Sequence, residues 1–395
     1  MTAYLIRRSL QMIMVVILAT IAIFALLNAV PGGPLSGLNM AVGAKNRLSP
    51  QEIARIEQTL GLNKPFYLSY LTWLLGEDWL DEVGNVIGNP GNPEKMLVTG
   101  TWADLQSPKC IAAGGTNQGT EEGKRPPCGR GVVRWDWGES WKLARGQTVT
   151  SVIGSRIKNT LILMSIVTVI SLVIAIPIGI ISAVRQYSKL DYAVTTFSFF
   201  GIAMPVFWFG LLMIILFTLK FREWGLPYFP SGDVFTTRVT PGSIQAVLGI
   251  TPYTLADRAV HLFLPVMVLT LLYLAGWSRF MRSSMLEVLR QDYVRTARAK
   301  GLHERAVIAK HAARNALIPL ITIVVFQIPG IFSGAILTET IFNYPGMGRL
   351  FIDALGRDDW PIVMAILFIT AILVVIATLV GDILYTIVDP RIRFD

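Results

Sequence analysis

The residues in this chain best suited to binding chemistry are nine Lys and Arg residues between Arg279 and Arg314. Only three acidic residues accompany them, Glu287, Asp292 and Glu304, so the segment carries a strong positive charge. Clustered Arg and Lys side chains favour contact with anionic surfaces. The segment therefore predicts either docking on a soluble, partly acidic protein or a solvated linker that lies on anionic lipid.

The centre of this segment predicts a short helix. Asp292 can cap a helix that begins at Tyr293, and Gly301 can end it in a left-handed turn. Ala297 and Gly301 are four residues apart, so they share a face and permit close approach of another backbone. The candidate docking residues are Asp292, Tyr293, Arg295, Thr296, Ala297, Arg298, Ala299, Lys300 and Gly301.

Catalytic and metal chemistry find little support in the sequence. The three histidines and two cysteines lack the spacing of a metal cluster. The stretch 119–125 is too short for a phosphate-binding loop and ends in Arg instead of Ser or Thr. We therefore expect no cofactor and no enzymatic site in this chain.

The composition indicates a membrane protein, because 53% of the residues are hydrophobic and only 15% are charged. A helix that crosses a bilayer needs about 20 apolar residues. The segments that meet or nearly meet this length are Ser9–Val30, Thr160–Val184, Thr195–Leu219, Val260–Trp277, Leu317–Leu337 and Ile362–Ile387. The sequence predicts an all-α integral membrane protein with six transmembrane helices, and its net charge of +9 reflects topology and lipid contact, with no nucleic-acid partner.

The distribution of positive charge predicts the orientation. Of the 35 Lys and Arg residues, 15 lie in the first eight residues, Arg185–Val194, Ser278–Ala316 and the tail from Val388. Short segments rich in Lys and Arg stay in the cytoplasm. Both termini and the basic segment are therefore expected to be cytoplasmic.

Three regions follow from this topology. Residues 1–30 hold the N-terminus and the first helix, 31–159 form an extracytoplasmic domain, and 160–395 form a core with five helices. Within the outer domain, 81–134 is rich in Gly, Pro and Asn and is interpreted as a loop-rich insertion. The core contains the basic loop 278–316.

The outer domain holds both cysteines of the chain, Cys110 and Cys128. Outside the cytoplasm they could form a disulfide that closes a loop of about eighteen residues and contributes about 3 kcal/mol. The outer tryptophans either lie on the membrane surface or fill a small core; they are Trp73, Trp79, Trp135, Trp137 and Trp141.

Short motifs recur along the chain in a specific order. They are Gly61–Pro65, Asn159-Thr160, Asp191-Tyr192, Tyr293–Gly301, His311–Pro319, Glu339–Gly348 and Asp389–Arg391. Together they resemble the first, B-type permease subunit of ABC importers of the dipeptide/oligopeptide/nickel family, and the stretch around Tyr293–Gly301 resembles its cytoplasmic coupling loop.

The chain departs from this family's pattern in two places. The importer motif E-A-A-x3-G is matched only at Ala297 and Gly301, with Arg295 and Thr296 in its first two positions, and Pro319 falls later than the usual proline. The region 81–134 is extra sequence relative to a typical member.

The resemblance implies a type I ABC importer-like permease in a bacterial or archaeal plasma (inner) membrane. Its implied partners are a second permease, two cytoplasmic ATPase subunits that bind ATP and Mg, an extracytoplasmic substrate-binding protein and membrane lipid. Di- or oligopeptides are the expected substrates, with nickel chelates and oligosaccharides as alternatives.

Two other classes of protein remain open. An ion-coupled secondary transporter acting alone would need acids in mid-membrane, and the only acid in a predicted span is Asp382, near its cytoplasmic end. A membrane-anchored receptor or scaffold would be dominated by its outer domain, which six spans do not favour.

Overall fold

The computed structural model describes residues 2–29, 66–76 and 129–388, and these ranges consist of helices joined by turns and irregular segments, with two isolated bridges. The all-α class predicted from the sequence is confirmed. The α-helices are α1 (Thr2–Asn28), α4 (Phe66–Leu75), α7 (Val149–Val184), α8 (Lys189–Ala203), α9 (Val206–Ile214), α10 (Phe221–Glu223), α11 (Ile244–Leu248), α12 (Leu255–Leu289), α13 (Asp292–Ala299), α14 (Glu304–Ala306), α15 (Arg314–Ala316), α16 (Ile318–Ser333), α17 (Ile336–Ile341), α18 (Met347–Gly356) and α19 (Trp360–Val388). A 3₁₀ turn, η3 (Val132–Arg134), and two π-helical segments, η4 (Ile215–Lys220) and η5 (Val307–Ala313), complete the set.

Each of the six predicted spans corresponds to helix. Four stretches are long and apolar enough to cross a membrane: Val149–Val184, Leu255–Leu289, Ile318–Ile341 and Trp360–Leu384. The first predicted span lies in α1, whose apolar part is Leu10–Leu26. The fourth span, expected to be the shortest, belongs to a helix of 35 residues, because polar residues continue α12 beyond both ends of its apolar part.

The third predicted span, Thr195–Leu219, is not one continuous helix. It consists of α8 and the stretch Val206–Glu223, which meet at a bend of 101°. Pro205 lies at the bend, where it has no N–H to continue the helix and disfavours a helical conformation at Met204. Met204 accordingly adopts an extended conformation, with φ −80° and ψ 124°.

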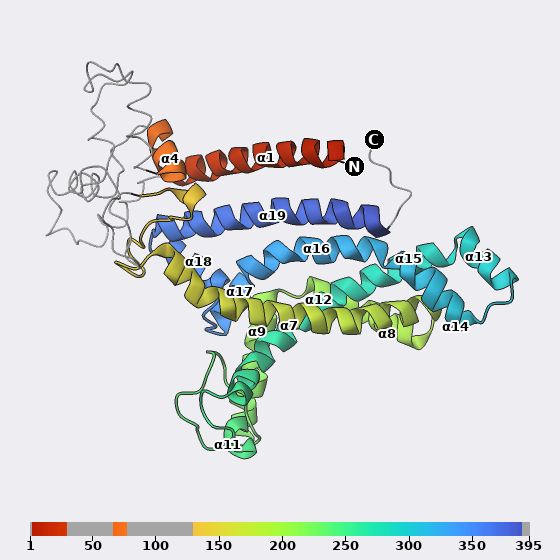
Figure 1. The fold of residues 1–395 in the computed structure, drawn as a ribbon. Helices are drawn as coiled ribbons and strands as arrows, with labels where there is room; N and C mark the ends of the chain where they lie inside the picture. Colours follow the sequence, from red (N-terminus) through yellow and green to blue (C-terminus); the bar gives the residue numbers. More distant parts are fainter. Residues whose placement is uncertain (1, 30–65, 77–128, 389–395) are drawn as a thin grey trace, which may run out of the picture. The chain divides into compact units, whose positions relative to one another are not determined.

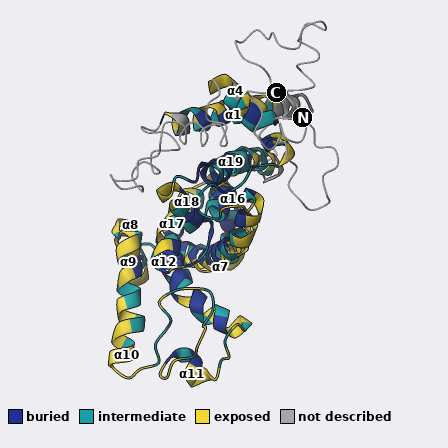
Figure 2. Cartoon of the chain, turned by 90° about the vertical axis from the view of Figure 1, so that its left-hand side faces the viewer, coloured by how far each residue is buried: buried dark blue, intermediate teal, exposed yellow. Residues whose placement is uncertain are grey.

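The chain divides into two compact units, of which the first comprises 1–15, 156–352 and 370–395. Within this unit α12 packs against α8 and α9 (Figure 1). Large parts of α12 are buried (Figure 2), whereas α10 is mostly exposed and α9 exposes Phe207, Trp208 and Leu211. In a membrane protein, such exposed apolar helix faces need no water-excluding partner of their own.

Glycines bring α7 and α8 close to α12. A Cβ added at Gly179 of α7 would lie 2.7 Å from Met281 Cβ and 2.8 Å from the Ser278 carbonyl oxygen. A Cβ added at Gly201 of α8 would lie 2.6 Å from Ala275 Cβ. Small residues permit close backbone approach between membrane helices, so these glycines set the spacing of the three helices.

The second unit comprises 16–155 and 353–369 and contains an aromatic cluster. Trp73 packs against Phe24 and Phe368, with ring centroids 5.6 and 5.8 Å away, and Trp137 lies 5.2 Å from Phe368. Trp137 is buried, whereas Trp135 is 67% exposed. Trp73 and Trp137 thus contribute to a small core, which was one of the two interpretations of these tryptophans.

Asp359 anchors the segment that precedes α7, also within the second unit. Its carboxylate accepts hydrogen bonds from Ser140 Oγ at 2.5 Å and from the backbone N–H groups of Trp141, Lys142 and Leu143 at 2.8–3.1 Å. Four donors satisfy a buried charge that would otherwise be costly. Cys110, Cys128, Trp79 and residues 81–128 of the predicted insertion lie outside the described residues.

The close contact between α7 and α12 gives the first prediction. Gly179→Val should destabilise the purified protein by about 1–3 kcal/mol, because the new side chain overlaps Met281. Thermal unfolding in detergent measures the effect. Gly276→Val on α12 is the matched control, since a Cβ there meets nothing within 4 Å. Equal losses for the two variants would contradict the packing role of Gly179.

Candidate functional site

Helix α13 occupies the centre of the loop between α12 and α16, where the sequence predicted a short basic helix. It begins at Asp292, one residue earlier than predicted, after an extended Gln291. Its end is as predicted, because Gly301 follows with φ +73°, a left-handed conformation that favours glycine. Asp292 lies in the first turn and Arg298 in the last, which matches the helix dipole at both ends.

One side of α13 is buried in its own chain. Val294 is 0% and Ala297 5% exposed. Both belong to a buried apolar cluster that also contains Ala183 of α7, Met281 and Met285 of α12, Val307, Ala312 and Ala313 of η5, Ala316 of α15 and Leu320. The expectation that Ala297 faces a partner together with Gly301 is therefore wrong, because Ala297 supplies the close contact between α13 and its own chain.

The opposite side of α13 is exposed and basic. The exposed candidate docking residues are Asp292, Tyr293, Arg295, Thr296, Arg298, Ala299, Lys300 and Gly301. The side chain of Arg295 is 73% exposed and lies 3.7 Å from the carboxylate of Asp292, so it is weakly paired. Tyr293, 43% exposed, adds an aromatic ring to this exposed face.

An ion pair braces the turn that follows α13. Arg298 Nη2 donates to Glu304 Oε1 at 2.8 Å, and Arg298 Nε lies 3.2 Å from Oε2. The hydrogen bond from Arg298 lowers the pKa of Glu304 below its usual value and raises the pKa of Arg298. Both groups are largely exposed, so the pair shapes the loop more than it stabilises the fold.

The segment after this turn returns to the membrane helices through η5. Its π-helical repeat places Val307 and Ala312 fully inside the apolar cluster. Ser284 of α12 donates its hydroxyl hydrogen bond to the Ala316 carbonyl at 2.8 Å. Short π-helical segments inside helices are frequent at functional sites. Buried contacts therefore tie both ends of the loop to α12.

A second polar arrangement joins α7, α8 and α12. Arg282 Nε donates to Asp191 Oδ1 at 2.5 Å, and Arg282 Nη2 donates to Oδ2 at 2.8 Å. The same carboxylate accepts from Ser182 Oγ at 2.5 Å and from the Tyr187 N–H at 2.9 Å. The sequence marked Asp191 only as a family landmark and missed Arg282, one of many basic residues in its loop.

The motifs Asn159-Thr160 and Glu339–Gly348, far apart in sequence, meet in the structure. Thr160 Oγ1 donates to Glu339 Oε1 at 2.9 Å and accepts from the Met347 N–H at 2.7 Å. Asn159 Nδ2 donates to the Pro345 carbonyl at 3.0 Å, and the Tyr344 hydroxyl donates to the Asn159 carbonyl at 3.1 Å. These contacts explain physically why the two motifs occur together.

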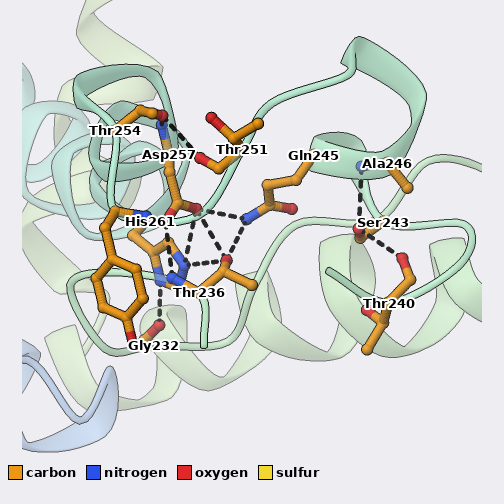
Figure 3. A network of polar contacts seen from close by, with 11 residues as sticks. Gly232, Thr236, Thr240, Ser243, Gln245, Ala246, Thr251, Thr254, Asp257 and His261 are labelled. Carbon is orange, nitrogen blue, oxygen red and sulfur yellow. Dashed lines mark hydrogen bonds and ion pairs between the residues drawn. The ribbon is translucent and has the colours of Figure 1, made fainter. Parts of the chain in front are cut away.

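The segment between α10 and α12 is held by a network that the sequence did not reveal (Figure 3). Asp257 accepts from the N–H and the hydroxyl of Thr236, both at 2.8 Å, and from the Tyr253 N–H at 3.1 Å. His261 Nε2 lies 2.9 Å from Thr236 Oγ1, and His261 Nδ1 donates to the Gly232 carbonyl at 2.6 Å. No periodicity or spacing signals this network, because Asp257 and His261 lie on α12 whereas their partners Thr236 and Gly232 lie on an irregular segment.

The observed spans also contain acids that the sequence analysis placed outside them. Glu339 falls in Ile318–Ile341 and Asp257 in Leu255–Leu289, and both are fully buried. Each lies near a helix end and is surrounded by protein donors. Asp382, placed in a span from the sequence, forms an ion pair with Arg8 at 2.8 Å.

Comparison with known proteins agrees with this arrangement. Residues 175–394 match the family described as "Binding-protein-dependent transport system inner membrane component", and residues 1–82 match its N-terminal counterpart. The chain belongs to this family of integral inner-membrane transport components. The resemblance to B-type ABC importer permeases inferred from the short motifs is thereby confirmed.

Relatives match the whole chain. It is 37% identical over 394 residues to the oligopeptide transport system permease protein AppB of Bacillus subtilis (strain 168), covering 100% of both chains. It is 34% identical to the di/tripeptide permease DppB of Pseudomonas aeruginosa (strain UCBPP-PA14), with 95% and 94% coverage, respectively. It is 31% identical to the dipeptide permease DppB of Escherichia coli (strain K12), covering 100% of this chain and 99% of the relative.

The buried side of α13 gives a second prediction. Ala297→Glu should detach α13 from the cluster, because a carboxylate in an apolar contact without a partner is strongly unfavourable. Limited proteolysis of purified protein in detergent should then cleave the loop at least about tenfold faster, since each 1.4 kcal/mol of lost local stability corresponds to a factor of ten.

Ala299→Glu is the matched control, because Ala299 lies on the same helix and is exposed. This variant should be cleaved at the wild-type rate. Equal sensitivity of the two variants would show that the loop is not held by its buried side.

The contact between the two distant motifs gives a third prediction. Thr160→Val should cost about 1–3 kcal/mol in thermal unfolding, because Glu339 and the Met347 N–H each lose a buried partner. Thr160→Ser keeps the hydroxyl and should lose less. A valine variant as stable as the serine variant would argue against this hydrogen-bonded junction.

Proposed function

We propose that this protein is the membrane-spanning permease subunit of an ATP-driven importer for di- or oligopeptides. It forms the translocation pore with a second, related permease and takes its energy from two cytoplasmic ATPase subunits. An extracytoplasmic binding protein delivers the substrate. Membership in the transport family and the names of the peptide permease relatives support this proposal.

The observation that carries the coupling role is the two-sided structure of α13. Val294 and Ala297 hold one side of the helix in the chain, and the other side presents Tyr293, Arg295 and Lys300 to solvent. A helix that is fixed on one side and exposed on the other can transmit force from a soluble partner. Its positive charge suits a partly acidic groove on an ATPase subunit.

ATP binding would act on this helix from outside the chain. Closure of the two ATPase subunits would displace α13, and the buried cluster would carry the displacement to α7, α12 and α16. The pore would then switch between inward-facing and outward-facing states, because the partner binds the two states with different affinity. ATP and Mg would be bound by the ATPase subunits, so this chain acts as a transport subunit without an ATPase site of its own.

The topology proposed with this function places both termini and the loop between α12 and α16 in the cytoplasm. Residues 31–159 would face the binding protein. The predicted insertion and its cysteines, Cys110 and Cys128, would lie on that side. Peptides are the proposed substrates because the relatives are named for them.

The exposed basic face of α13 gives the fourth prediction. Reversing the charge of Arg295 and Lys300 to Glu should weaken binding of the ATPase subunit by about tenfold or more, because like charges then meet across the interface. Substrate-stimulated ATP hydrolysis by the reconstituted complex should fall with it. Pull-down of the ATPase subunit and phosphate release measure the two effects.

Arg145→Glu is the control, since Arg145 is exposed and lies outside this loop. It should leave binding of the ATPase subunit unchanged. Wild-type stimulation in the Arg295/Lys300 double variant would refute the assignment of α13 as the docking helix. Transport by this chain alone in sealed vesicles would favour an ion-coupled carrier instead.

A further inference from the structure

The polar group around Asp191 lies where three helices meet. Asp191 is in the first turn of α8, Ser182 is near the end of α7, and Arg282 is on α12. Asp191 is 2% exposed, and its two oxygens accept four hydrogen bonds, from Arg282 Nε and Nη2, Ser182 Oγ and the Tyr187 N–H. We call this group the Asp191 clamp.

The clamp borders the apolar cluster beneath α13. Ser182 precedes Ala183 of that cluster, and Arg282 follows its Met281. Displacement of α13 therefore reaches the helix positions next to the clamp by direct packing. Close-packed apolar contacts transmit such displacement because they leave little free volume.

Helix α8 takes no part in the cluster. Among the described residues, the cluster and the side chains packed against it come from α7, α12, α13, η5, α15 and α16 with their connections, and none comes from α8. Towards its start, α8 is joined to this region by the clamp. Further along, Ser198 of α8 lies 3.3 Å from Ser278 and Gly201 approaches Ala275.

A bidentate ion pair suits this joint. The planar guanidinium of Arg282 fixes the carboxylate of Asp191 in both distance and orientation, which a single contact does not do. Buried pairs contribute little net stability relative to apolar packing, but breaking one is costly. The pair of Asp191 and Arg282 therefore fixes the position of α8 relative to α12.

We propose that Asp191 and Arg282 are positioning residues that make α8, and with it the bent third span, follow α12 when α13 is displaced. This inference rests on the docking function proposed for α13. Through the clamp, displacement of the loop would also move α8, a helix that the loop does not contact. Without the clamp, the ATPase subunits would still bind, but their cycle would no longer drive the pore.

The test uses the complete reconstituted complex, with both permeases, the ATPase subunits and the binding protein loaded with peptide. Asp191→Asn preserves size and removes the charge, and Arg282→Gln removes the partner. Each should keep basal ATP hydrolysis and lower peptide uptake per ATP hydrolysed by about tenfold, within the usual range of coupling between sites. The double variant should be no worse than either single variant, because both break one interaction.

A distance measurement tests the joint in the protein with its clamp intact. Spin labels at Tyr192→Cys on α8, which is 61% exposed, and at the exposed Glu287→Cys on α12 report the separation of the two helices. With the clamp present, this distance should be the same without nucleotide and in the state trapped with ADP and vanadate. With Asp191→Asn added, it should differ between the two states.

Asp382→Asn is the matched control, since it breaks another Arg–Asp pair, Arg8–Asp382 at 2.8 Å, between α1 and α19. It should leave uptake per ATP unchanged. Normal coupling in Asp191→Asn and Arg282→Gln, additive losses in the double variant, equal loss in Asp382→Asn, or a nucleotide-dependent distance with the clamp intact would each overturn the proposal. Failure of the docking function would appear separately, as a lack of substrate-stimulated ATP hydrolysis in the wild-type complex.

Discussion

Two buried side chains, Val294 and Ala297, hold the eight residues of α13 against the rest of the chain. A helix this short is marginal in water, where isolated helices need about 12–15 residues. Its shape therefore depends on the apolar cluster formed by α7, α12, η5, α15 and α16. The same contact determines which side chains of α13 remain available to a partner. The basic face is exposed because Val294 and Ala297, on the other side of the helix, are the residues that face inward.

Helix α12 connects the apolar cluster beneath α13 to other helices of the first unit. It supplies Met281 and Met285 to the cluster beneath α13 and Arg282 to Asp191. It also meets α7 and α8 where Gly179 and Gly201 allow close approach. Without a hydrophobic driving force between helices in lipid, close packing and polar contacts must supply the association. α12 provides both along its length, so it links the loop to helices that the loop does not contact.

Much of this arrangement could be predicted from the sequence. Long apolar runs predicted the positions of the apolar helices, because crossing a bilayer requires length and low polarity, but they did not predict the break in the third span. Gly301 predicted the end of α13 because its conformation favours glycine. The inward side of Ala297 could not be predicted, since a small residue suits contact with its own chain and with a partner equally well. The pairing of Arg282 with Asp191 was hidden among nine basic residues, because composition does not specify contacts between helices.

The bend at Pro205 has a consequence for the surrounding lipid. The fifteen residues of α8 rise about 22 Å, which is less than the hydrocarbon thickness of about 30 Å. Because Pro205 has no N–H, the Gly201 carbonyl lacks its α-helical donor. Open backbone of this kind is tolerated at membrane depth only beside protein or a water-filled cavity. Protein or a water-filled cavity must therefore separate the acyl chains from the break in the third span.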